Sequence, residues 1–185
     1  MPFSLRLRDG AEGGGELVFH TILRSLPGQR VSGLALWRRD ETFAKLFTGR
    51  RARIHCRREE QGLRALHDAK LAAPRILYSG LAEDGYVLIT ECLAPAKTAR
   101  ELWSEAADDD ARLELLLRLV QVVASHHNAG LQQRDLHLNN FLAAHEKIYT
   151  LDGAGIVQRA PGKAAALDNL GLLFAQVEPR FDRFA

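Results

Sequence analysis

The sequence has few of the features that would place it outside the cell or across a membrane. It contains only two cysteines, Cys56 and Cys92, which are too few for a disulfide framework and lack the spacing of metal ligands. Charged residues and glycines interrupt the N-terminal segment before any apolar run develops, so no secretory signal is expected. The most apolar helical segment is broken by Arg118, short of the roughly 18 apolar residues of a membrane span. These features predict a soluble, cytoplasmic protein and leave peripheral contact with a membrane surface open.

The chain also lacks a large net charge. Its 185 residues include 25 lysines and arginines against 23 acidic residues, and 46% of them are hydrophobic. This balance is typical of a globular protein and argues against global disorder and against a nucleic-acid binder. The charge is unevenly distributed, however: residues 1–75 carry 15 basic and 8 acidic side chains, and residues 76–185 carry 10 and 15.

The first half of the chain is predicted to be mainly β-structure after a flexible, glycine-rich lead-in at residues 9–15. Short apolar and β-branched runs separated by turn residues predict antiparallel strands at 17–23, 31–37, 42–47, 76–78 and 86–90. Between the third and fourth runs, residues 57–70 place Glu59, Leu63 and Leu66 on one helical face. Pro74 is expected to end that helix, which gives the order β-β-β-α-β-β.

The second half is predicted to be helical. Helices are expected at 98–107, from about 108 to 128 and at 167–177, with short apolar pieces at 140–143 and 147–151. The acidic triplet 108–110 suits the positive end of the long helix, and Asp168 is expected to cap the last one. His126 and His127 fall near a helix C-terminus, where positive charge is favoured, and are interpreted as structural.

Three residues near the middle of this half have the spacing of a phosphoryl-transfer site. Asp135 lies five residues before Asn140, and Asp152 follows twelve residues later at the end of a β-like run, before Gly153. Phosphoryl transfer needs one carboxylate to accept or orient the proton of the attacking hydroxyl. It also needs a second carboxylate and an amide oxygen to hold Mg²⁺ against the nucleotide phosphates, because that cation prefers oxygen ligands.

With these motifs, residues 17–178 resemble the protein-kinase-like superfamily, and most of all the bacterial lipopolysaccharide core kinases, the Kdo/heptose kinase family. The resemblance implies an α+β, two-lobed protein-kinase-like fold with a β-rich N-lobe (1–92) and an abbreviated helical C-lobe (93–185). It implies ATP and Mg²⁺ as cofactors, Asp135 as the catalytic carboxylate, and Asn140 and Asp152 as metal ligands.

The same resemblance requires a lysine on the third strand and a glutamate on the following helix. Lys45 lies inside the apolar run 42–47 and would bind the nucleotide phosphates. Glu59 is the expected partner of Lys45 because it shares a helical face with Leu63 and Leu66, and Glu60 is the alternative.

The resemblance also implies further nucleotide contacts, from the places of these residues along the chain. Glu91 and Leu93 fall at the hinge that meets adenine, and Gly28 lies in the turn 25–30 that would cover the phosphates.

Further residues near these motifs have open assignments. His137 could contact the acceptor or make a structural hydrogen bond, and Arg134 could pair with an acid or be exposed. Asp168 could also brace the catalytic loop. The arginines 50, 51, 53, 57 and 58 form either a solvated basic face or a contact for anionic lipid headgroups or for a phosphorylated, carboxylate-rich sugar core.

The sequence departs from the kinase pattern at three places. The turn 25–30 has one glycine instead of a series, and Gln133 stands where a histidine commonly opens the catalytic loop. Only 33 of the 185 residues follow Asp152, so either the acceptor platform is short or the natural chain continues past Ala185. No Ala-Pro-Glu segment follows Asp152, so regulation by activation-loop phosphorylation is not expected.

The expected function is therefore ATP-dependent phosphorylation of a sugar hydroxyl of the lipopolysaccharide inner core, at the cytoplasmic face of the inner membrane. The alternatives are a small-molecule or protein kinase on the same fold, because fold determines the phosphoryl donor better than the acceptor, and a catalytically idle kinase-like binding protein.

Overall fold

The computed structural model describes residues 2–8 and 15–184, so most of the predicted lead-in lies outside the described residues. The chain divides into two compact units. The first comprises residues 1–61 and 74–92, and the second comprises residues 62–73 and 93–185. Residues 62–73 thus group with the second unit, although the boundary expected from the sequence lay at residue 92.

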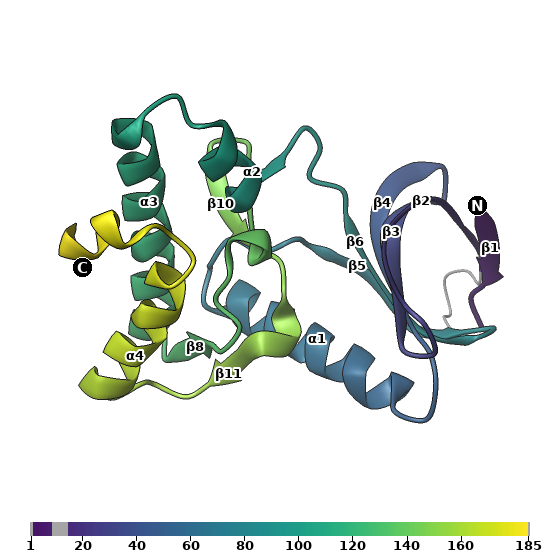
Figure 1. Cartoon of the computed structure of the whole chain (residues 1–185). Coiled ribbons are helices and arrows are strands. Elements are labelled where there is room, and N and C mark those ends of the chain that lie inside the picture. Colours follow the sequence, from purple (N-terminus) through teal and green to yellow (C-terminus); the bar gives the residue numbers. More distant parts are fainter. Residues whose placement is uncertain (1, 9–14, 185) are drawn as a thin grey trace. The chain divides into compact units, whose positions relative to one another are not determined.

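The first unit is built on one antiparallel sheet of six strands in the order β1-β2-β3-β4-β6-β5. The strands are β1 (Phe3–Arg6), β2 (Glu16–Leu26), β3 (Arg30–Trp37), β4 (Asp40–Phe47), β5 (Ile76–Ala82) and β6 (Gly85–Glu91). The prediction of five strands was one short, because β1 has only four residues and precedes the glycine-rich segment. A bridge between Leu7 and Ala82 links the two edges of the sheet, which therefore curls on itself (Figure 1).

Successive side chains of each strand point to opposite faces of the sheet. On β4, Thr42, Ala44 and Leu46 are buried at every second position, and Ala44 and Leu46 join the apolar core inside the curl. Lys45 lies on the opposite face of the same strand, and this places its ammonium outside that core.

In the described part of residues 1–92 the one helix is α1 (Ala52–Asp68), which begins five residues earlier than predicted. Arg53 therefore lies on the helix together with Arg57 and Arg58, which already fell within the predicted range. Its buried face carries Cys56, Glu59, Leu63 and Leu66 at helical spacing. The helix ends ahead of Pro74, as predicted, and Lys70 has the left-handed φ of 58° in the turn that follows.

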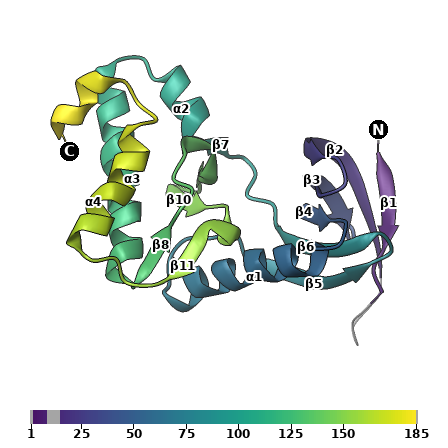
Figure 2. The same cartoon turned by 60° about the horizontal axis from the view of Figure 1, so that its bottom comes forward.

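Besides the end of α1, the described residues of the second unit form three longer helices and five short strands. The helices are α2 (Ala99–Glu105), α3 (Asp109–Asn128) and α4 (Lys163–Phe174), and the strands are β7 (Lys97–Thr98), β8 (Leu131–Gln133), β9 (Phe141–Ala144), β10 (Lys147–Thr150) and β11 (Ile156–Gln158). Short 3-10 turns are η1 (Leu138–Asn140), η2 (Gly153–Gly155) and η3 (Pro179–Phe184). Helices α3 and α4 lie side by side (Figure 2) and share one apolar core that includes Leu116, Leu119 and Leu173. Among the described residues, no helix combines the length and the apolar character that crossing a bilayer requires.

Side-chain caps define the starts of two of these helices. Asp108 accepts a hydrogen bond from the Ala111 N–H at 2.9 Å, which confirms the acidic triplet as the start of α3. Thr98 and Glu101 form a reciprocal capping box on α2. Helix α4 begins at Lys163, so the prediction that Asp168 caps it was wrong: Asp168 lies in the middle of the helix.

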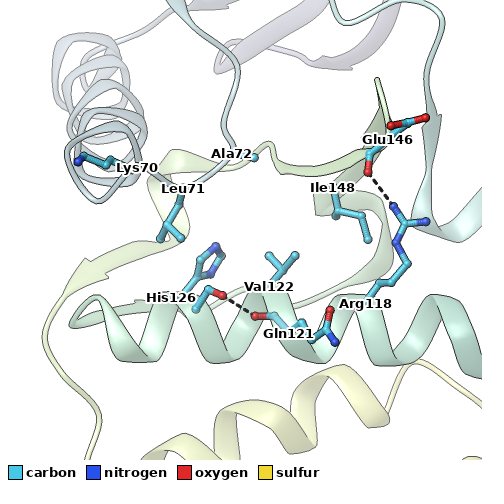
Figure 3. A pocket seen from close by; sticks show the side chains of 10 residues that line it. Lys70, Leu71, Ala72, Arg118, Gln121, Val122, His126, Glu146 and Ile148 are labelled. Carbon is cyan, nitrogen blue, oxygen red and sulfur yellow. Dashed lines mark hydrogen bonds between the residues drawn. The ribbon is translucent and has the colours of Figure 1, made fainter.

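His126 joins α3 to β10 inside the second unit. Its side chain is 1% exposed, and its Nε2 lies 3.1 Å from the Thr150 hydroxyl. Figure 3 shows the ring rising from α3 toward Leu71. Burial, with a smaller contribution from the neighbouring His127, lowers the pKa of His126 to about 4. The structural interpretation therefore holds, but the ring is neutral at pH 7, contrary to the expectation of a favourable positive charge at the helix end.

Acid should destabilise the protein through this histidine. In the folded state the pKa of His126 lies below the ordinary value of 6.5. The stabilisation that comes from burying the neutral ring is therefore complete above pH 6.5 and is lost as the pH falls toward 4. The difference between a pKa of 6.5 and one of about 4 corresponds to a loss of roughly 3 kcal/mol in the free energy of unfolding when His126 becomes protonated. Urea unfolding as a function of pH should show a shallower acid dependence for His126→Gln than for the wild type. The exposed His55→Gln should follow the wild type, and equal slopes for all three proteins would contradict the assignment.

Candidate active site

Two loops of the second unit carry the predicted catalytic and metal-binding residues. The first, residues 134–140, runs from β8 to β9, and the second, residues 152–155, runs from β10 to β11. Strand β11 pairs antiparallel with β8, so Ile156 lies opposite Gln133. The β9–β10 hairpin and the β8–β11 pair thus hold the two loops at both ends.

Three hydrogen bonds join these loops and the residues directly before them. The Leu151 N–H donates to the Asn140 carbonyl at 2.9 Å, and the Arg134 N–H donates to the Gly155 carbonyl at 2.9 Å. The side-chain amide of Gln133 donates to the Asp152 carbonyl at 3.0 Å. The structure therefore brings Asp135, Asn140 and Asp152 together in one clamped pair of loops.

Asp135 is held by its neighbours in the first loop and keeps an open side. The Asn140 Nδ2 donates to the Asp135 carbonyl at 2.8 Å and lies 3.4 Å from its Oδ2, and the His137 Nε2 lies 3.5 Å from the same oxygen. The Asp135 side chain is nevertheless 61% exposed. One carboxylate oxygen is thus oriented by the loop, while the carboxylate as a whole stays accessible to a substrate.

Asp152 provides a carboxylate oxygen suited to a cation. Its Oδ1 is buried, and no group among the described residues hydrogen-bonds to it. A buried, unpaired carboxylate oxygen is costly unless a positive group satisfies it. The amide of Asn140 uses its NH₂ group on Asp135, which leaves its oxygen as a possible second ligand.

The oxygen donors of Asp152 and Asn140 are of the kind that suits Mg²⁺. The described part of the chain contains no group of three or more His, Cys, Asp or Glu side chains that could hold a metal ion. Mg²⁺ is usually held by one or two protein oxygens together with substrate phosphates. Asp152 and Asn140 match that pattern.

Gln133 and Asn169 support the loops from behind, a role that the sequence pattern did not predict for either residue. Gln133 is fully buried, and its carbonyl accepts a hydrogen bond from the Asn169 Nδ2 at 2.7 Å. The Asn169 Oδ1 in turn lies 2.9 Å from the His127 Nε2. A chain of hydrogen bonds therefore runs from α3 through α4 to the carbonyl of Asp152.

The brace from the last helix is thus Asn169 and not Asp168. Asp168 is exposed, whereas Asn169 is 2% exposed and makes both bonds. The prediction placed the supporting residue in the correct turn of the helix but chose Asp168 instead of Asn169. The sequence alone does not show which of these two neighbours faces the core.

Two glycines allow the close approach of the second loop to its surroundings. A Cβ atom on Gly62 of α1 would lie 1.8 Å from the Gly153 carbonyl oxygen. A Cβ atom on Gly155 would lie 2.0 Å from the Gln133 Oε1. Larger side chains at either position would displace the loop that carries Asp152.

The predicted lysine–glutamate pair forms in the first unit. The Lys45 ammonium contacts the Glu59 carboxylate, which is fully buried on α1. The alternative residue, Glu60, accepts a hydrogen bond from the Ser79 hydroxyl at 2.8 Å. The structure therefore pairs Lys45 with Glu59, and the role of this pair in phosphate binding stays a prediction.

The remaining predicted nucleotide-binding residues have defined positions. Gly28 has a φ of 68° in the turn between β2 and β3, a conformation that favours glycine. Glu91 ends β6 and accepts a hydrogen bond from the Arg75 N–H at 2.8 Å. Leu93 is 8% exposed.

The described residues of the second unit form at least two pockets. The first, of about 400 Å³, includes Asp135 and is formed by the catalytic loop and the end of α4; it is lined by Arg134, Asp135, Leu136, His137, Asn139, Leu172, Ala175 and Gln176. The second is formed by the turn after α1, by α3 and by the β9–β10 hairpin (Figure 3), where Arg118 donates to the Glu146 carbonyl at 3.3 Å. Of these two pockets, the first includes the predicted catalytic residue Asp135, and the second is lined by no predicted site residue.

Comparison with known families matches residues 23–171 to the lipopolysaccharide kinase (Kdo/WaaP) family. This range covers most of the chain and includes the lysine–glutamate pair, both loops and Asn169. A comparison with curated proteins found no match.

Removal of the Asn169 side chain should disturb the protein far more than removal of its neighbour. Asn169→Ala leaves the buried Gln133 carbonyl and His127 without their partner, so a loss of about 1–3 kcal/mol in unfolding free energy is expected. Asp168→Ala changes an exposed side chain and should stay within about 0.5 kcal/mol of the wild type. Urea unfolding of the two variants measures this difference. Equal losses would show that Asn169 does not brace the loop.

Proposed function

Because the chain belongs to the lipopolysaccharide kinase (Kdo/WaaP) family, we propose that it transfers the γ-phosphoryl group of ATP to a sugar hydroxyl of the lipopolysaccharide inner core. The family consists of kinases. ATP as the donor, Mg²⁺ as the cofactor and the core sugar as the acceptor belong to the proposal. Since that acceptor is joined to a lipid, the reaction would occur at the cytoplasmic face of the inner membrane.

The observation that carries this proposal is the clamped pair of loops with the unpaired Asp152 oxygen. Asp135 would accept or orient the proton of the acceptor hydroxyl, because its carboxylate is accessible and oriented by Asn140 and His137. The Asp152 Oδ1 and the amide oxygen of Asn140 would hold Mg²⁺. When bound, that ion supplies neutralisation of the negative charge on the phosphates.

Residues of the first unit, together with Leu93 of the second, would supply the nucleotide contacts. The buried Glu59 fixes the position of the Lys45 ammonium, which would pair with the phosphates. The backbone of Glu91 and Leu93 would meet the adenine, and the turn around Gly28 would cover the phosphates with fewer amide donors than a glycine-rich loop offers.

Two other functions are compatible with the same fold. A small-molecule or protein kinase would share the donor chemistry and differ only in the acceptor. A catalytically idle binding protein is favoured by the single glycine in the phosphate turn. The hydrogen-bond support behind Asp152 argues against a catalytically idle protein, because simple binding does not require a catalytic carboxylate held next to a metal ligand.

An assay with labelled ATP and a set of core oligosaccharides, aminoglycosides and protein substrates separates the three functions. Nucleotide binding without any turnover would identify the idle protein.

The pocket beside Asp135 is the proposed acceptor site. Arg134, His137, Asn139 and Gln176 line it with hydrogen-bond donors. Within the described residues, the Arg134 side chain is exposed and forms no ion pair. An exposed arginine beside the catalytic carboxylate suits a sugar that carries a carboxylate or phosphate group.

Substitution of the two aspartates should separate chemistry from nucleotide binding. Asp135→Ala should abolish transfer in single-turnover assays and leave Mg-ATP affinity within about twofold, because the residue acts on the acceptor hydroxyl. Asp152→Ala should weaken Mg-dependent ATP binding itself by at least about tenfold, as measured by calorimetric titration. Unchanged single-turnover transfer by Asp135→Ala, or unchanged Mg-ATP affinity of Asp152→Ala, would refute the corresponding role.

Arg134→Gln tests the acceptor site. It should raise the KM for an anionic core acceptor by roughly 10-fold to 100-fold, because a charge-assisted hydrogen bond is lost, with the KM for ATP unchanged. The exposed Arg100→Gln on α2 is the matched control and should behave as the wild type. With an acceptor whose carboxylate is converted to an amide, Arg134→Gln and the wild type should have similar KM values. An equal effect on charged and neutral acceptors would exclude the proposed contact.

A further inference from the structure

The first half of α1 carries a basic stripe on its exposed face. Arg53, Ile54, Arg57 and Arg58 recur at helical spacing, and all four are exposed. Arg50 and Arg51, which are also exposed, precede the helix and extend the stripe. The opposite face of the same helix is buried through Cys56 and Glu59.

The stripe has no acidic partner on its own helix. Residues 50–58 contain no acidic side chain, and the next two acids are committed elsewhere: Glu59 is buried against Lys45, and Glu60 accepts from Ser79. Within the described residues, none of the five arginines forms an ion pair. The positive charges are therefore available to an external anion.

The placement of these charges opposes the stability of the helix. The first turn of α1 contains no acid, whereas α2 and α3 each begin with acidic residues. Cations near the positive end of a helix dipole are destabilising by a few tenths of a kcal/mol each. Local helix energetics thus do not explain why this stripe is basic.

An apolar side chain lies within the stripe. Ile54 is 63% exposed and is flanked along the helix by Arg53, Arg57 and Arg58. A convex helix face that offers several cations and one exposed apolar side chain suits an extended anionic surface better than a single small ligand, which is usually held in a concave site.

We propose that the exposed arginine face of α1, with Ile54 at its centre, binds the anionic phospholipid headgroups of a bilayer. The planar guanidinium groups match phosphate oxygens, and Ile54 would enter the headgroup region. This surface would hold the enzyme next to an acceptor that is itself joined to a lipid. The binding requires no step of the proposed phosphoryl transfer, so each can fail without the other.

Sedimentation with lipid vesicles tests this surface. The wild-type chain should bind vesicles that contain phosphatidylglycerol, bind neutral phosphatidylcholine vesicles weakly, and be released by salt. The triple variant Arg53→Gln/Arg57→Gln/Arg58→Gln should lose roughly 100-fold in affinity, on the basis of roughly fivefold for each arginine. Ile54→Ser should weaken binding further at high salt, where the apolar contact carries more of the affinity.

Two matched variants control for charge and folding. Arg24→Gln/Arg159→Gln removes exposed arginines elsewhere and should bind vesicles to within roughly fourfold of the wild type. The triple Arg→Lys variant at 53, 57 and 58 keeps the charge and should retain most of the binding. Phosphoryl transfer to a soluble acceptor should be unchanged in the triple Gln variant.

Three outcomes would overturn the proposal. They are equal binding of the triple Gln variant and the wild type, binding that ignores the anionic lipid, and displacement from vesicles by stoichiometric soluble core oligosaccharide. The last result would assign the arginines to the saccharide instead of the bilayer.

Discussion

The candidate site depends on the pairing of β8 with β11. These strands have only three residues each, yet they join the segment that leads into the catalytic loop to the segment that leaves the metal-binding loop. Gln133 lies at the end of this pairing and donates its side-chain amide to the Asp152 carbonyl. Because its own carbonyl is held by Asn169, a displacement of α4 would be transmitted to the residue that precedes the catalytic loop. The positions of both carboxylates thus depend on a few directional hydrogen bonds.

Helix α1 has different roles at different points along its length. Glu59 is buried and pairs with Lys45, which keeps a cation ordered on the sheet of the first unit. Three residues later, Gly62, which already belongs to the second unit, permits the helix backbone to pack against the Gly153 carbonyl of the same unit. The outward face near its start carries the arginines. One amphipathic helix therefore combines a buried ion pair, a close backbone contact and a charged exposed surface, since its 3.6-residue period separates them on different sides.

Much of the architecture was predictable because it follows from local patterns. Alternating apolar residues marked the strands β2 to β4, and Asp108 marked the start of α3. The short strand β1 was missed, since four residues carry too little pattern, and α4 was placed four residues late because its first turn lacks a capping side chain. Within the site, Asn169 was missed in favour of Asp168 because burial on a largely apolar helix depends on what packs against it.

The sequence by itself determined the family resemblance, the spacing of Asp135, Asn140 and Asp152, and the choice of Glu59, because these rest on residue identity and helical period. Only the tertiary structure decided that Gln133 supports Asp152, that Asn169 supports Gln133, and that His126 is neutral. Those properties arise from contacts between segments far apart in the chain and from the exclusion of water. Neither can be derived from local sequence, because both depend on which groups the fold brings together.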